Sequence, residues 1–244
     1  YGHAKTGKGT TMPGAYQYTG TGGTTFGGVN PSLLRVLSSK SPQLAHDSWV
    51  TVGITDGDGQ KKLSMLENGD GKTGFIAWGK SSKQSLKVTD GSLYTTPANG
   101  CKAHICTLAQ LTLMSPHELT ATLNLKGRTG DSNGNGWAGS IKFTQNTPCA
   151  TSKPPPPPPT AIKCPAKPSK TVRTVRPVIA IFKTVSNSNP AYKLGYRTTI
   201  RLQVQFNPSA KGGGPKNLKA GANVFAIYGH AKTGKGTTMP GAYQ

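Results

Sequence analysis

Acidic residues are scarce in this chain. Its 244 residues include 8 Asp and Glu against 29 Lys and Arg, which gives a formal net charge of +21 at pH 7. So few carboxylates leave little material for a catalytic pair, and neither a G-x-S-x-G nor an H-E-x-x-H motif is present. We therefore expect no enzymatic activity and no cofactor. The excess positive charge predicts a surface that attracts polyanions.

Long apolar runs and aromatic residues are also in short supply. Hydrophobic residues make up 34% of the chain. No apolar run approaches the ~20 residues that cross a membrane, so we expect no membrane span. Aromatic residues make up 7%, and the basic stretch TVRTVRP, residues 171–177, contains none. Surfaces that bind single-stranded nucleic acid combine basic residues with stacking aromatics, so we expect no nucleic-acid partner.

Three motifs that would indicate a ligand or a modification are absent or incomplete. No N-x-[ST] sequon occurs. The stretch GHAKTGKGT, residues 2–10, resembles a phosphate-binding loop, but Gly9 stands where Ser or Thr must hold magnesium. DSNGNG, residues 131–136, begins like a calcium loop, but Lys142 stands where a bidentate Glu is required. We interpret the first stretch as a flexible loop and the second as a β-turn.

Four cysteines occur: Cys101, Cys106, Cys149 and Cys164. Their spacing matches no zinc pattern, and an even number fits disulfides in an oxidising compartment. We therefore expect an extracellular or cell-surface location. Of the three possible pairings we favour Cys101–Cys106 across the loop CKAHIC, which leaves Cys149–Cys164 by elimination. If the second pair does not form, the segment between those two cysteines acts as a spacer.

The most informative feature is an exact internal repeat. Residues 1–17, YGHAKTGKGTTMPGAYQ, recur letter for letter as residues 228–244. We interpret 1–17 as a segment that connects repeats, and 228–244 as the start of the next repeat in an array or fibre. A terminal duplication is the alternative. The residues we expect at the contact between repeats are Tyr1, Gly2, His3, Met12, Pro13, Tyr16, Tyr228, Gly229, His230, Met239, Pro240 and Tyr243.

A proline-rich linker at residues 151–163 is the strongest boundary in the chain. It contains six consecutive prolines, which favour an extended polyproline II rod. A rod flanked by Ser and Thr is typical of O-glycosylated stalks. The candidate glycosylation sites, with the prolines hydroxylated first, are Thr151, Ser152, Pro154, Pro155, Pro156, Pro157, Pro158, Pro159 and Thr160.

The rest of the chain is patterned as β-strands. Apolar and polar residues alternate over residues 118–126 and 197–206. Further candidate strands are residues 48–54, 73–78, 111–114, 140–143, 177–185 and 223–228. We predict an all-β fold, with antiparallel β-sandwich units of Ig-like or jelly-roll-like type joined by the polyproline linker. Residues 18–150 would form the sandwich body, and residues 164–227 would complete a sandwich in the same chain or in the next repeat.

Three stretches resemble repeat domains of large secreted surface proteins of algae and other aquatic protists. They are NVFAIYG…MPGAYQ…FGGVNPSLL, HDSWVTVGITDGD and LAQLTL…LKGRTG. The linker is similar to those of hydroxyproline-rich glycoproteins such as the pherophorins. The resemblance implies an extracellular structural protein that is glycosylated on hydroxyproline.

These observations together predict a structural repeat of an extracellular filament. Its partners would be copies of itself and covalent O-glycans. The alternative is a secreted module that binds acidic polysaccharide through its basic surface.

Overall fold

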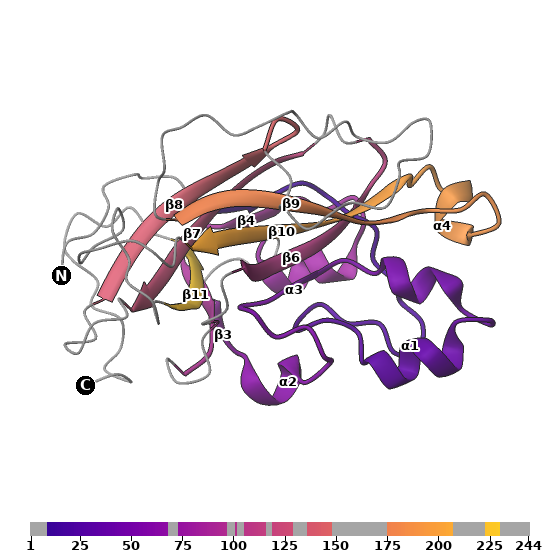
Figure 1. The fold of residues 1–244 in the computed structure, drawn as a ribbon, viewed down its shortest axis with the longest axis horizontal. Coiled ribbons are helices and arrows are strands. Elements are labelled where there is room, and N and C mark those ends of the chain that lie inside the picture. The colour runs from indigo at the N-terminus through magenta and orange to yellow at the C-terminus, as the bar shows by residue number, and fades with distance from the viewer. Residues whose placement is uncertain are drawn as a thin grey trace.

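The chain folds mainly into antiparallel β-strands, as the sequence predicts (Figure 1). The structure is a computed structural model, and it describes residues 9–67, 73–96, 101, 105–115, 119–128, 136–147, 175–206 and 223–229. The linker, residues 1–8 of the first 17-residue copy and residues 230–244 of the second lie outside these ranges. The Ig-like or jelly-roll-like type and the repeat units stay predictions.

The larger sheet has seven strands. Their order is β3 (Ser64–Glu67), β5 (Gly91–Tyr94), β11 (Asn223–Gly229), β7 (Thr120–Arg128), β1 (Thr10–Met12) and β4 (Leu86–Val88). The seventh strand, β8 (Gly136–Thr144), pairs with β7 along its whole length. Because β8 fills one edge of β7, β11 and β1 share the opposite edge.

The smaller sheet has four strands. Their order is β2 (Trp49–Val50), β6 (Ile105–Leu113), β10 (Thr198–Phe206) and β9 (Val175–Thr184). Strands from before and after the linker therefore pair in both sheets, β10 with β6 in the smaller one and β11 with β7 in the larger one.

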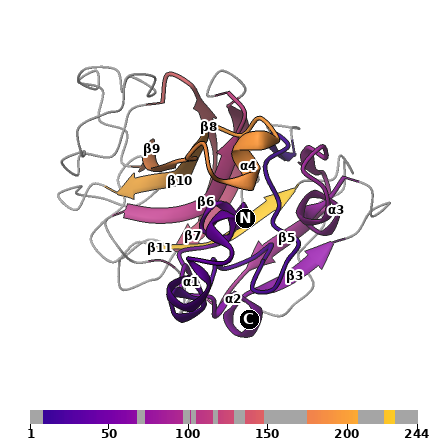
Figure 2. The same cartoon turned by 90° about the vertical axis from the view of Figure 1, so that its right-hand side faces the viewer.

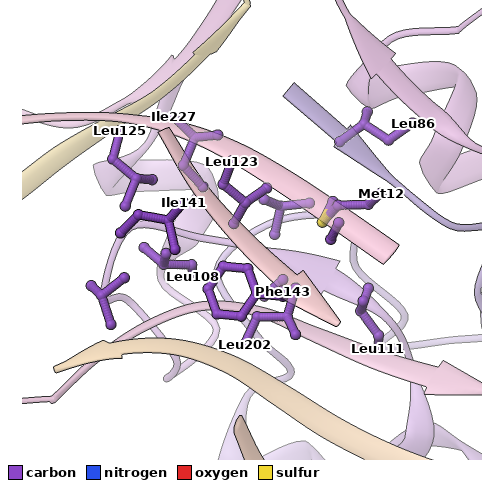
Figure 3. Close-up of a cluster of buried hydrophobic side chains, with 14 of the residues drawn as sticks. Met12, Leu86, Leu108, Leu111, Leu123, Leu125, Ile141, Phe143, Leu202 and Ile227 are labelled. Carbon is purple, nitrogen blue, oxygen red and sulfur yellow. The ribbon is translucent and has the colours of Figure 1, made fainter. Parts of the chain in front are cut away.

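Side chains from both sheets form one hydrophobic core. In Figure 3, Leu123 of β7, Phe143 of β8 and Leu202 of β10 belong to the same buried cluster. The alternation expected within residues 118–126 and 197–206 is confirmed for the central parts of β7 and β10, where alternate residues are buried in this core. These residues are Ala121, Leu123, Leu125, Ile200, Leu202 and Val204.

The described helices are short. They are α1 (Pro31–Leu37), the 3₁₀ helix η1 (Pro42–His46), α2 (Gly59–Lys62), α3 (Phe75–Lys80) and α4 (Pro190–Lys193). Figure 2 shows α1 and α2 on one side of the molecule, away from β8 and β9. In the parts of the chain that the structure describes, no helix has the length and apolar character needed to cross a membrane.

The strand predicted at residues 73–78 is wrong, because this stretch begins α3. Phe75 and Trp78 are three residues apart, so they lie on one helical face, and both are buried in the core. The Glu67 carboxylate accepts hydrogen bonds from the backbone amides of Phe75 (2.6 Å) and Ile76 (3.4 Å) at the start of the helix. A carboxylate from β3 thus satisfies amides that a helix N-terminus leaves unpaired.

The strand predicted at residues 48–54 is shorter than expected. Only Trp49–Val50 forms a strand. Thr51 ends it, since its hydroxyl donates to the Ile54 carbonyl and accepts from the Ile54 amide. A side chain that bonds the nearby backbone favours a turn over a sheet ladder.

Candidate functional site: the joint between strands β11 and β1

Strands β11 and β1 follow one another along the same edge of β7. Tyr228 of β11 lies opposite Asn124, and Thr11 of β1 lies opposite Thr122. Both strands are antiparallel to β7, so they run in the same direction. The end of β11 therefore meets the start of β1, although the two lie more than 200 residues apart in sequence.

The Thr10 hydroxyl connects the two strands. It donates to the Tyr228 carbonyl oxygen at 2.6 Å and accepts from the Asn124 backbone amide at 3.0 Å. Thr10 is fully buried. A side chain thus takes the place of backbone ladder bonds where one strand ends and the next begins.

Two glycines let the backbones approach closely at this joint. A Cβ atom on Gly9 or on Gly229 would lie 2.2 Å from the Val88 carbonyl oxygen of β4. Real Cβ atoms do not approach so closely, so neither position accepts a side chain unless the backbone shifts. Gly9 leads into β1 and Gly229 ends β11, so both flank the same carbonyl group.

The segment after Thr10 is held in the larger sheet. Met12 is 2% exposed and lies in the core, with Leu86 and Leu123 in the same cluster (Figure 3). The Trp78 indole donates to the Pro13 carbonyl oxygen at 3.0 Å. Packing and this hydrogen bond fix the segment against α3 and β4.

The same segment then crosses to the smaller sheet. The Tyr16 amide donates to the Thr112 carbonyl of β6 at 2.9 Å, and the Ser48 amide donates to the Tyr16 carbonyl at 3.1 Å. The Tyr16 ring lies 5.0 Å from the Tyr196 ring, centroid to centroid. Residues 10–17 therefore link the two sheets. We call the groups that contact them the β1 site: Leu86, Val88, Trp78, Asn124, Thr112, Ser48, Ser82 and Tyr196.

A buried carboxylate anchors the chain just beyond this segment. Asp47 accepts from the Tyr18 amide at 2.8 Å and from the Thr24 amide at 2.7 Å, and it is 1% exposed. Burial raises the pKa of Asp47 to about 7, against the lowering effect of these backbone hydrogen bonds. Burial, together with the nearby Asp47 charge, raises the pKa of Tyr16 to about 12.

His46, next to Asp47, belongs to a buried polar cluster. Its Nδ1 atom lies 2.7 Å from the Thr199 hydroxyl, which in turn lies 2.7 Å from the Thr112 hydroxyl. Burial, and secondly the charge of Lys183, lowers the pKa of His46 to about 4. This histidine is therefore neutral at pH 7 and serves as a hydrogen-bonding group between η1 and the smaller sheet.

Cys101 and Cys106 lie side by side as thiols. Burial, and secondly a hydrogen bond with the Cys101 side chain, raises the pKa of the Cys106 thiol. Cys101 also forms an isolated bridge with Val224 of β11. The proximity suits the favoured pairing, which stays a prediction, and Cys149 and Cys164 lie outside the described residues.

The structure brings together part of the predicted contact set. Met12, Pro13 and Tyr16 lie on the segment at the β1 site, and Tyr228 and Gly229 lie at the joint. The other predicted contact residues lie outside the described ranges, namely Tyr1, Gly2, His3, His230, Met239, Pro240 and Tyr243. The proposed glycosylation sites also lie outside the described ranges. They are Thr151, Ser152, Pro154, Pro155, Pro156, Pro157, Pro158, Pro159 and Thr160.

Several residues in and beside the joint are not marked by any local sequence pattern. Thr10 is inside the repeated sequence, so the repeat itself could have pointed to it. Val88, Asn124 and Asp47 carry no local signal, because their roles depend on which strands become neighbours. In the described ranges, no three His, Cys, Asp or Glu side chains gather as a metal site would require.

Comparisons with protein-family models, with curated proteins and with solved structures find no match.

Proposed function

We propose that this chain is a structural repeat of an extracellular filament, O-glycosylated on its proline-rich linker. One observation carries the proposal: the Thr10–Tyr228 hydrogen bond joins the end of β11 to the start of β1. Thr10 belongs to the first copy of the 17-residue sequence, and Tyr228 begins the second. A sequence present at both ends of the chain therefore meets at one point in the fold.

The strand order supports this proposal. In a repeating chain, β9, β10 and β11 would come first, and the residues after β11 would lead directly into β1. The folded unit would then end with β8. The linker, which lies between β8 and β9 in sequence, would separate one unit from the next. This order places the extended prolines between folded units, where a spacer is expected.

Glycosylation would give the linker a mechanical role. Sugars on residues 151–160 would stiffen an extended polyproline segment and shield it from proteases. Glycopeptide mass spectrometry of the native protein should find hydroxyproline and O-glycans on this stretch. An unmodified linker peptide would contradict this part of the proposal.

Electron microscopy of the native material tests the filament. We expect unbranched filaments with a regular axial repeat and with glycan density at the linker. Treatment with glycosidases should thin the filaments without dissolving them, because the joint is made of protein. Isolated, unassembled particles in native material would contradict the proposal.

Binding of acidic polysaccharide is the second candidate, and the charge distribution favours it. Among the described residues, Lys62 forms ion pairs with Asp56 (3.7 Å) and Asp58 (3.1 Å). Asp47 and Glu67 instead accept hydrogen bonds from backbone amides. The chain as a whole carries a formal net charge of +21. Binding to polygalacturonate that weakens with salt, with neutral dextran as control, would support this candidate. Equal retention on both polymers would contradict it.

A further inference from the structure

We infer that residues 237–244 bind at the β1 site in the same way as residues 10–17, so that two identical copies compete for one site. The inference deepens the proposed function and rests on it for its biological role, because a filament of repeats needs one copy for each site. The binding itself is a property of the single chain and can be measured without any filament.

Every group that residues 10–17 use at the β1 site is repeated in residues 237–244. Met239 corresponds to Met12, which is 2% exposed in the core. The other contacts use the Thr10 hydroxyl, the Pro13 carbonyl and the backbone of Tyr16. Identical sequences offer identical contacts, so the contacts themselves contribute the same free energy for both copies, which differ only in how each is connected to the fold.

The second copy reaches the site from β11 in the correct direction. Seven residues, 230–236, separate Gly229 from Thr237. Fully extended, they would reach about 24 Å. The gap to close is short, because the Tyr228 carbonyl already accepts from Thr10 at the start of β1. Strands β11 and β1 also run the same way along β7, so the chain can continue from one into the other without reversing.

The glycines at the joint suit such a connection. Gly229 directly precedes the connecting stretch, and Gly236 ends it as the counterpart of Gly9. Both Gly229 and Gly9 lie against the Val88 carbonyl. The two ends of the connecting loop would therefore start and finish beside the same group. A tether of this length gives a high effective concentration, so the copy attached to β11 is the competitor to which we commit.

Variants of the buried methionine test the inference in the full chain. An Asp side chain at this core position would be a buried, unpaired charge, so it should exclude its copy from the site. We expect Met12→Asp alone and Met239→Asp alone to melt within about 3 °C of the parent chain, because the intact copy takes over. The double variant should melt more than about 10 °C lower. Met114→Asp, at a methionine that is 47% exposed, is the matched control and should change little.

Hydrogen exchange with mass spectrometry provides the second readout. In Met12→Asp the two copies differ in mass, so the amide of Tyr243 can be followed separately from that of Tyr16. Protection at Tyr243 in this variant is the expected result. The inference is overturned if Met12→Asp melts as low as the double variant, or if Tyr243 exchanges freely. A melting temperature of Met12→Asp that falls on dilution would overturn binding within the same chain. Filaments missing from native material would overturn the proposed function but leave this result standing.

Discussion

Thr10 and Tyr228 are 218 positions apart in sequence, yet the Thr10 hydroxyl donates to the Tyr228 carbonyl oxygen at 2.6 Å. This bond lies where β11 ends and β1 begins on the shared edge of β7. Through this bond, the first and second copies of the repeated sequence meet at one position in the fold. The filament proposal and the proposed exchange of the two copies both depend on this relationship.

Removing the Thr10 hydroxyl in both copies should weaken the joint. The variant Thr10→Val with Thr237→Val keeps the shape of the side chain, but it leaves the Tyr228 carbonyl and the Asn124 amide without this partner. We expect a loss of about 1–3 kcal/mol in the free energy of unfolding, measured by urea denaturation. Thr11→Val with Thr238→Val is the matched control, because Thr11 is only half-buried. Equal effects of the two pairs would contradict the role assigned to Thr10.

A side chain at Gly229 should disturb the joint sterically. Gly229→Ala would place Cβ 2.2 Å from the Val88 carbonyl oxygen, so a backbone must move. We expect a destabilisation of roughly 1–3 kcal/mol, seen as a lower thermal midpoint. Gly139→Ala in β8 is the control, because a Cβ there meets nothing within 4 Å. If Gly229→Ala and Gly139→Ala have the same thermal midpoint, the close approach of Gly229 to the Val88 carbonyl is contradicted.

The neighbours His46 and Asp47 should drive opposite pH dependences. The pKa of Asp47 rises from 3.8 to about 7 on folding, so its contribution to stability is present below pH 3.8 and is lost as the pH rises to about 7. The pKa of His46 falls from 6.5 to about 4, so its contribution is present above pH 6.5 and is lost as the pH falls to about 4. Between these limits the two trends oppose each other.

Single variants should separate these two trends. We expect the stability of Asp47→Asn to increase with pH between about 4 and 6.5, because the His46 trend is left alone. The stability of His46→Gln should decrease over the same window. Urea midpoints at half-unit pH steps measure both slopes. Parallel slopes in the two variants would show that these pKa directions are wrong.

The side-by-side thiols of Cys101 and Cys106 should form a disulfide if the protein is extracellular, as proposed. Each thiol would lose one proton and one electron, and a protein disulfide or molecular oxygen would accept the electrons. Non-reducing peptide mapping should recover the two residues as one linked peptide. Alkylation of both thiols in the native protein, or a link to Cys149 or Cys164, would contradict the pairing.

The sequence predicts where the β-strands lie along the chain better than it predicts which elements become neighbours in the fold. Alternation over residues 118–126 and 197–206 identifies β7 and β10, because one face of each strand is buried. The stretch 73–78 looks like a strand by composition, but the spacing of Phe75 and Trp78 and the carboxylate of Glu67 favour a helix. That carboxylate comes from another element, so a local pattern cannot reveal its role.

The candidate site was predictable only in part, for the same reason. The repeat pointed to Met12, Pro13, Tyr16, Tyr228 and Gly229, since identical sequences imply a shared environment. Their partners on β4, β7 and α3 are chosen by tertiary packing. The carbonyl of Val88 and the amide of Asn124 are backbone groups, which no residue pattern marks as special.

Peptide mapping of the native protein tests the central claim most directly. If the 17-residue sequence is a joint shared by successive repeats, a proteolytic peptide should run from FAIYG through a single copy of the sequence and on into YTGTGG. Mass spectrometry should find this peptide in high yield. A chain that begins at Tyr1 in every molecule, with no peptide that spans the junction, would contradict the account.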